Sequence, residues 1–311
     1  MIVTPENMDF SNKNIIMIIS GLPGTGKTTL ALSAPDVLLI DADEGMARVK
    51  PEHRKDSSLS KTYEEVLEDI KAATGVYKTI VVDTGGSFVD MLKDWAIRND
   101  RTIYTSKGNI DTRAVFRVVK TEFLRISYEL KLKFNMIYLF HVSKEKNADG
   151  YDWFEILCEG SAKTMVYQPA DLAGYLHIVN GERYIGFTPT MNYNAKSAYG
   201  IKGLIKIKEL TDSDSNDFLT KLFQQVKKNI ASEKELYKPQ KEAYEKAITQ
   251  GKEIINTITD VNTATKAGDD IQKIEHALTS KAEIVSLFKT KLADVGISWD
   301  AKNKKYVEKS Q

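Results

Sequence analysis

The fold is decided by residues 14–29, which read Asn14-Ile15-Ile16-Met17-Ile18-Ile19-Ser20-Gly21-Leu22-Pro23-Gly24-Thr25-Gly26-Lys27-Thr28-Thr29. Residues 14–20 are apolar and rich in β-branched side chains, which is typical of a strand covered on both faces. Residues 21–28 fit the pattern G-x-x-x-x-G-K-[ST], and residues 28–33 are predicted to begin a helix that Pro35 ends. A glycine-rich loop between a strand and a helix is the context that this pattern requires. The stretch therefore predicts a phosphate-binding loop.

The chemistry of this loop predicts ATP and Mg²⁺ as cofactors. Glycines let backbone N–H groups curl around phosphates, and the amino end of the following helix adds positive potential. Lys27 is expected to reach the β- and γ-phosphates, and Thr28 to coordinate Mg²⁺. A chance glycine-rich turn is the competing interpretation. The predicted nucleotide-binding residues are Gly21, Pro23, Gly24, Thr25, Gly26, Lys27, Thr28 and Thr29.

Further strands and helices alternate after the loop, which predicts an α/β fold with a mostly parallel sheet. Strands are expected at residues 37–40, 79–82 and 136–140, the last ending at His141, and helices at residues 63–73 and 114–132. Polar residues gather just past the strand ends, where such sheets bind ligands. Asn180-Gly181 separates apolar runs at residues 174–179 and 182–187, and this dipeptide predicts an antiparallel hairpin at one edge of the sheet.

The composition changes near Thr211. No arginine occurs from Thr211 to Gln311, and helical spacing is found in four segments, at residues 218–226, 234–258, 271–278 and 282–295. We therefore predict two regions, a nucleotide-binding core over residues 1–210 and a helical C-terminal region over residues 211–311.

Bulk composition favours a cytoplasmic protein. The 311 residues are 42% hydrophobic and 28% charged, and no segment approaches the run of roughly 18 apolar residues that a membrane helix needs. Residues 1–12 lack the pattern of a secretory signal, and the single Cys158 excludes an internal disulfide. A net charge of +1 gives no general attraction to nucleic acid, so any such contact needs a local basic patch.

Asp83 follows the strand predicted at residues 79–82 and is the natural acid to hold Mg²⁺ opposite Thr28. A turn-forming role at the strand end is its alternative. Thr84 and Ser87 either add hydroxyl contacts or form the turn.

Residues 41–45, Asp-Ala-Asp-Glu-Gly, follow the strand after the loop helix. A carboxylate there can orient the water that attacks the γ-phosphate, and the sequence does not choose between Asp43 and Glu44. A solvated acidic loop is the alternative. His141 closes the fourth strand, where it either contacts the γ-phosphate or is a structural hydrogen-bonding group.

With these motifs placed, the chain resembles the RecA-like ATPases, and most of all the small phage nucleotide-binding proteins related to RadA, some of which are single-strand-annealing recombination proteins. The resemblance covers residues 14–204 and is carried by residues 21–29, 39–45, 80–84 and 140–143. It implies a RecA-like P-loop core, a location in the host cytoplasm if the chain is phage-encoded, and a catalytic base at Asp43 or Glu44.

The resemblance also implies contacts outside the subunit. His141 would lead into a DNA-binding loop at residues 142–153, and Lys196 in Lys196-Ser197-Ala198-Tyr199-Gly200 would reach the nucleotide of a neighbouring subunit. The family has arginine where this chain has Ala198, a departure that weakens the analogy. An exposed loop lysine is the alternative for Lys196.

Three classes of function follow. The leading hypothesis is an oligomeric ATPase of phage-type recombination or single-strand annealing, with ATP bound between subunits. The candidate contacts to single-stranded DNA are Tyr104, Lys107, Tyr151 and Trp153. Lys144 and Lys146 are weaker candidates. The alternative is a nucleotide-dependent regulatory or assembly protein that binds protein partners through residues 211–311. A small-molecule kinase is disfavoured because Arg113, Arg117 and Arg125 fall on a predicted helix and not in a lid.

Overall fold

The structure is a computed structural model that describes residues 13–146, 149–211 and 213–308. The described chain divides into two compact units, one up to Asn229 and one from Ile230. This division lies within the long helix α6 (Phe218–Asn256), whereas the predicted domain boundary at residue 210 precedes that helix. The functional extent of each region stays a prediction.

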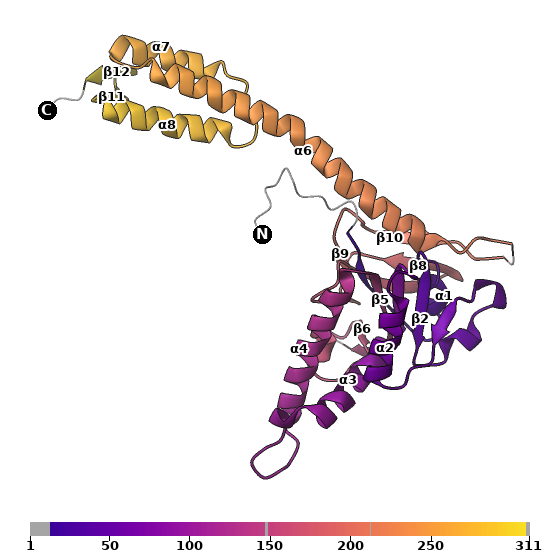
Figure 1. Cartoon of the computed structure of the whole chain (residues 1–311). Coiled ribbons are helices and arrows are strands. Elements are labelled where there is room, and N and C mark those ends of the chain that lie inside the picture. The colour runs from indigo at the N-terminus through magenta and orange to yellow at the C-terminus, as the bar shows by residue number, and fades with distance from the viewer. Residues whose placement is uncertain (1–12, 147–148, 212, 309–311) are drawn as a thin grey trace. The chain divides into compact units, whose positions relative to one another are not determined.

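A mostly parallel sheet forms the centre of the first unit (Figure 1). Among the described residues the sheet has ten strands. Eight of them follow the order β10-β8-β7-β1-β5-β4-β2-β3, and the other two, β6 and β9, pair with β5 and β7. The strands are β1 (Ile16–Gly21), β2 (Val37–Asp41), β3 (Asp56–Ser58), β4 (Thr79–Asp83), β5 (Asn135–Lys146), β6 (Asp152–Ile156), β7 (Leu172–Val179), β8 (Glu182–Gly186), β9 (Lys196–Ser197) and β10 (Leu204–Ile207).

Both faces of the central strands are covered, which explains their unbroken apolar sequences. The side chains of Ile16 and Ile18 belong to a core with the helices α2, α3 and α4, while Met17 and Ile19 are buried on the opposite face. The predicted helix at residues 63–73 is confirmed as α2. The helices of the first unit are α1 (Lys27–Ala31), α2 (Tyr63–Ala73), α3 (Gly85–Asn99), α4 (Thr112–Lys131) and α5 (Ala162–Met165).

Parallel register brings the polar strand ends to one edge of the sheet. Gly21 lies opposite His141, and Asp41 lies opposite Asp83. Residues from four different segments of the chain thus meet beside the glycine-rich loop, as ligand sites do in open parallel sheets.

The predicted edge hairpin is confirmed. β7 and β8 pair antiparallel with Val179 opposite Glu182, so Asn180-Gly181 is the whole connection. Both turn residues have positive φ, 52° and 81°, which the two-residue turn of a hairpin requires and which asparagine and glycine tolerate. The predicted α/β class, with its parallel sheet, edge hairpin and helical C-terminal region, is therefore confirmed.

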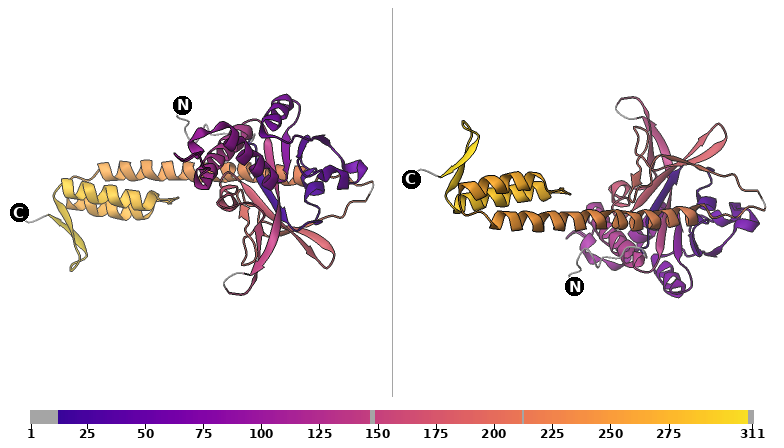
Figure 2. Two further views of the ribbon diagram at one scale, coloured as in Figure 1. Left: turned by 90° about the horizontal axis from the view of Figure 1, so that it is seen from below. Right: turned by 90° about the horizontal axis from the view of Figure 1, so that it is seen from above.

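The predicted end of the fourth strand at His141, with a loop at residues 142–153, is wrong. β5 continues to Lys146 and pairs antiparallel with β6, so a hairpin replaces the loop. Charged residues such as Lys144 and Glu145 give no apolar pattern, so this part of the strand is defined by its backbone pairing with β6. The β5–β6 and β7–β8 hairpins project from the same side of the first unit (Figure 2).

The helix α3 was missed because Thr84-Gly85-Gly86-Ser87 resembles a turn in sequence. Thr84 is instead the N-cap of α3, and its hydroxyl accepts a hydrogen bond from the backbone N–H of Ser87. This cap offsets the weak helix propensity of the two glycines.

The second unit consists of the later part of α6, the helices α7 (Val261–Gln272) and α8 (Ser280–Asp294), and the hairpin of β11 (Ile297–Asp300) and β12 (Lys305–Glu308). The predicted helix at residues 271–278 is wrong, because α7 starts earlier, at a capping box between Asp260 and Thr263. The predicted break between residues 226 and 234 is also wrong, since α6 continues through it. Helix α8 confirms the segment at residues 282–295. None of the described helices combines the length and apolar character of a membrane span.

Candidate nucleotide-binding site

The glycine-rich loop connects β1 to α1 with a backbone that only glycine adopts easily. Gly24 and Gly26 have φ values of 77° and 90°, and Gly26 is the N-cap of α1. Such a left-handed turn before a helix directs successive N–H groups into one concave space, which is how backbone amides bind a phosphate. The loop therefore has the geometry that its sequence predicted.

The side chain of Lys27 is 5% exposed and uses all three ammonium hydrogens. It donates to the carbonyl oxygens of Gly21 and Leu22, both at 3.0 Å, and to Nδ1 of His141 at 3.2 Å. Burial lowers the pKa of Lys27 to about 8; Asp83 opposes this shift and Arg48 adds to it. A buried cation at low pKa gains strongly from a nearby anion such as a phosphate.

Thr28 and Asp83 form the candidate metal site. The hydroxyl of Thr28 donates to Oδ2 of Asp83 at 2.6 Å. Burial raises the pKa of Asp83, an effect that the Thr28 hydrogen bond opposes and that Asp41 and Asp43 reinforce. A hydroxyl and a carboxylate fit a Mg²⁺ ion that also binds substrate phosphates, and the ion would neutralise this crowded negative charge.

Asp41 fixes the backbone at Gly45 and Met46, next to Thr28 and Asp83. Its carboxylate accepts from the N–H groups of Gly45 at 2.6 Å and Met46 at 3.0 Å. A Cβ on Gly45 would lie 2.9 Å from Oδ2 of Asp83, so only glycine fits here without displacing the carboxylate. The acidic segment therefore contributes one structural acid, Asp41, that the sequence did not distinguish.

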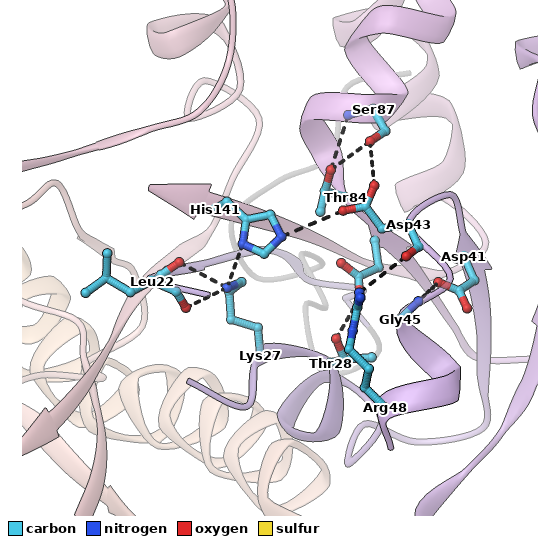
Figure 3. Close-up of polar contacts among 12 residues, drawn as sticks. Leu22, Lys27, Thr28, Asp41, Asp43, Gly45, Arg48, Thr84, Ser87 and His141 are labelled. Carbon is cyan, nitrogen blue, oxygen red and sulfur yellow. Dashed lines mark hydrogen bonds and ion pairs between the residues drawn. The ribbon is translucent and has the colours of Figure 1, made fainter. Parts of the chain in front are cut away.

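His141 lies between Lys27 and Asp43 (Figure 3). Because an ammonium can only donate, Nδ1 of His141 is an acceptor, and the neutral ring carries its proton on Nε2, 3.7 Å from Oδ2 of Asp43. Burial and the charge of Lys27 lower the pKa of His141, so the ring is neutral at pH 7. The other carboxylate oxygen of Asp43 accepts from the hydroxyl of Ser87 at 3.0 Å.

The structure distinguishes Asp43 from Glu44 by position. Asp43 belongs to the group of Lys27, Asp83 and His141, whereas the side chain of Glu44 is 77% exposed and lies 3.9 Å from Lys61. Glu44 also has a positive φ of 53°, so its backbone is in the left-handed region. The catalytic roles of both acids stay predictions.

The other predicted residues lie outside this group. Lys196 is exposed on β9, where it donates to the carbonyl of Tyr167 and pairs in register with Ala173 of β7. Its reach into a neighbouring subunit stays a prediction. Pro23 and Thr29 lie on the loop and on α1.

The predicted DNA contacts occupy two segments. Tyr104 and Lys107 are exposed in the connection before α4, and Tyr151 is exposed beside β6. Trp153 is half-buried, and its indole donates to Glu155. Arg113, Arg117 and Arg125 lie on α4, as predicted, and Arg125 pairs with two glutamates of its own helix.

Two arginines near the loop, Arg48 and Arg183, were not predicted from the sequence as site residues. Ser87, predicted either to add a hydroxyl contact or to form a turn, donates to Asp43. Arg48 follows the acidic segment and donates to the carbonyl of Asp43 at 3.3 Å. The guanidinium of Arg183, on β8, lies next to Gly26: a Cβ built on Gly26 would be 3.5 Å from Cζ of Arg183, an ordinary van der Waals contact. The Asn180-Gly181 turn fixes the register of Arg183 but gives no indication that β8 passes the loop.

Comparison with known proteins identifies the region that carries this site. A family model described as an AAA domain matches residues 13–199, more than half of the chain. A prototypical ATPase from the type III secretion system of pathogenic bacteria is similar at 15% identity, covering 90% of this chain and 81% of that one, with a TM-score of 0.37. The flagellar accessory protein FlaH from Methanocaldococcus jannaschii is similar at 12% identity, covering 63% and 91%, with a TM-score of 0.26. No curated protein matches the sequence.

Proposed function

The chain belongs to the AAA domain family, and on that premise we propose that it binds Mg·ATP in the loop of residues 21–28 and hydrolyses it. The observation that carries this proposal is the 2.6 Å contact of Thr28 with Asp83, beside the buried ammonium of Lys27. A phosphate-binding turn, a cation and a pair of metal-binding oxygens are the parts that phosphoryl transfer to water needs.

In this proposal different residues bind the phosphates, activate the attacking water and hold the metal ion. Backbone amides of the loop and Lys27 hold the phosphates and stabilise the charge that develops in the transition state. Asp43 orients a water molecule for attack on the γ-phosphate and accepts its proton, while the Ser87 hydroxyl fixes the direction of the carboxylate. Mg²⁺, when bound by Thr28 and Asp83, neutralises phosphate charge.

We further propose that the ATPase acts in phage-type DNA recombination or single-strand annealing, as an oligomer with ATP between subunits. The RadA-like motifs support this, as does the continuity of β5, which carries His141 beside Lys27 and then forms the hairpin that ends near Tyr151 and Trp153. A contact between His141 and the γ-phosphate would thus act directly on a strand that reaches the surface.

One observation favours the second candidate, a regulatory or assembly ATPase that binds protein partners. Lys144 and Lys146 on the β5–β6 hairpin both pair with Asp152, at 2.8 Å and 2.5 Å. Their charges are compensated within the hairpin, which reduces its attraction for a phosphate backbone. The helices and hairpin of the second unit would then provide the partner surface.

ATP turnover with and without single-stranded DNA tests both proposals. Wild-type protein is expected to hydrolyse ATP with Mg²⁺, and Lys27→Ala to lose this activity, while Lys133→Ala, an exposed lysine on another surface, retains it. Stimulation by DNA that weakens as salt rises, together with a larger particle in sedimentation, would support the recombination proposal.

Hydrolysis without any response to DNA, and without assembly, would contradict recombination and leave the partner-binding ATPase. Absence of Mg·ATP binding by the wild-type protein would contradict the ATPase proposal itself.

A further inference from the structure

A large cavity opens directly beside the phosphate-binding loop. Its volume is about 740 Å³, within the range of small-molecule sites. Gly26 of the loop and Thr29 of α1 are among the residues that line it. All of its lining residues belong to the first unit, from Gly26 to Leu222. Apolar side chains of Leu176, Ile205 and Leu222 contribute to the wall, which suits a flat, partly apolar group.

One buried polar atom on this wall has no partner. His53 lines the cavity, is 5% exposed, and its Nε2 makes no hydrogen bond to any part of the chain that the structure describes. Leaving such an atom unsatisfied is costly, and a native structure that retains it usually reserves it for a ligand or a water molecule.

Arg183 lies where the cavity meets the loop. Its guanidinium faces Gly26 and also lines the cavity. Within the part of the chain that the structure describes, this guanidinium forms no ion pair with a carboxylate. By contrast, the lysines of the wall are compensated: Lys206 pairs with Glu182, and Lys208 and Lys221 pair with Asp214 and Asp217. An uncompensated arginine fork beside a phosphate-binding loop has the geometry to bind a phosphate oxygen pair.

We propose that this cavity holds the nucleoside part of ATP, with His53 hydrogen-bonded to the base or ribose and Arg183 bound to the phosphate next to the ribose. This rests on the proposed function, since it assigns the remainder of the same nucleotide. The chain thereby supplies a phosphate-binding arginine to its own site, from the β7–β8 hairpin, independently of any residue from a neighbouring subunit.

Titration calorimetry with two probes separates the two contacts. Mg·ATP contains both nucleoside and phosphates, whereas Mg·tripolyphosphate contains phosphates alone. Arg183→Ala is expected to weaken both probes roughly tenfold to a hundredfold, as for loss of a charged hydrogen bond. His53→Gln is expected to weaken ATP severalfold and to leave tripolyphosphate unchanged. Ile205→Trp, which fills the cavity, is expected to act like His53→Gln but more strongly.

Arg117→Ala, an exposed arginine on α4, is the matched control and should bind both probes as the wild type does. Circular dichroism melting shows whether the buried His53 substitution still folds, and Ile205→Trp provides the same test at a half-buried position. Unchanged ATP affinity in Arg183→Ala, or equal effects of Ile205→Trp on both probes, would overturn the inference while wild-type ATP binding still supports the proposed function. Failure of the wild type to bind ATP would remove both.

Discussion

Oγ1 of Thr28 lies 2.6 Å from Oδ2 of Asp83, although 55 positions separate the two residues in the sequence. The contact exists because β1 and β4 both pair in parallel with β5, so their carboxyl ends come to the same edge of the sheet. A hydroxyl on the first turn of α1 thereby meets an acid at the end of a strand. This pair is the centre of the candidate site, and its charge state governs the first prediction.

Asp83→Asn is expected to lower Mg-dependent hydrolysis on the order of 10²-fold, because the amide is a poor metal ligand. It is not expected to lower the stability of the fold. Burial raises the pKa of Asp83, so the folded state prefers the protonated carboxyl, and the ionised form costs stability as pH rises above the ordinary value of 3.8. Asparagine imitates the protonated form, so the melting temperature at pH 7 should equal or exceed that of the wild type. A lower melting temperature would contradict this account of the buried acid.

Asp43→Asn is expected to reduce kcat on the order of 10²-fold with little change in KM, since the carboxylate faces the group of Lys27 and His141. Glu44→Gln is the matched control on the adjacent residue, and its exposed side chain predicts less than about a twofold effect. Steady-state ATPase kinetics distinguish the two. The opposite ranking would assign the base to Glu44.

Binding of Mg·ATP is expected to weaken above about pH 8, the value to which burial lowers the pKa of Lys27. The ammonium is charged below this pH and attracts phosphate; above it, Kd should rise about tenfold for each pH unit. Lys27→Arg stays charged and should show no such inflection. A wild-type Kd that is flat from pH 7 to pH 9 would contradict the assignment.

The contribution of Lys27 to the stability of the fold should improve as pH rises, whereas its contribution to ATP binding is lost. Its pKa is lower in the folded state than the ordinary 10.5, so the unfolded chain binds the proton more strongly. The unfavourable contribution is therefore complete below about pH 8 and disappears as pH rises toward 10.5. Loss of ATP binding in this range would thus not reflect unfolding caused by Lys27.

Asp171 is expected to stabilise the first unit, far from the nucleotide. It is buried, accepts from the N–H of Ile16 at 2.9 Å and pairs with Lys131 at 2.6 Å. Asp171→Asn removes one partner of a largely buried pair and should cost about 3 kcal/mol of unfolding free energy. Asp36→Asn, which removes an exposed pair with Lys78, should cost less than about 1 kcal/mol.

The pH dependence of this contribution has a defined sign. Burial alone would raise the pKa of Asp171, but Lys131, the N–H of Ile16 and Lys13 outweigh it, and the pKa is lowered. Stability from Asp171 is therefore present above the ordinary value of 3.8 and lost as pH falls below it. Urea unfolding of wild type and Asp171→Asn at pH 7 and pH 3 should show the difference between them shrink in acid; a constant difference would contradict it.

The sequence alone was sufficient for features whose chemistry is local. The phosphate-binding pattern needs left-handed glycines at fixed spacing, and the structure has them at Gly24 and Gly26. Asn180-Gly181 specifies its hairpin because two successive positive φ values exclude most other residues. Apolar runs of β-branched residues likewise predicted the buried central strands, because strands covered on both faces have nearly continuous apolar sequences.

Only the tertiary structure decided which side chains meet. It placed Asp43 and not Glu44 beside His141, extended β5 into a hairpin, and brought His53 and Arg183 to one cavity next to Gly26. These outcomes depend on backbone pairing between segments, most of them distant in the chain, and on the direction of each side chain from its backbone. A pattern along the sequence records neither, because the free energy that fixes them comes from contacts formed only when the whole sheet has assembled.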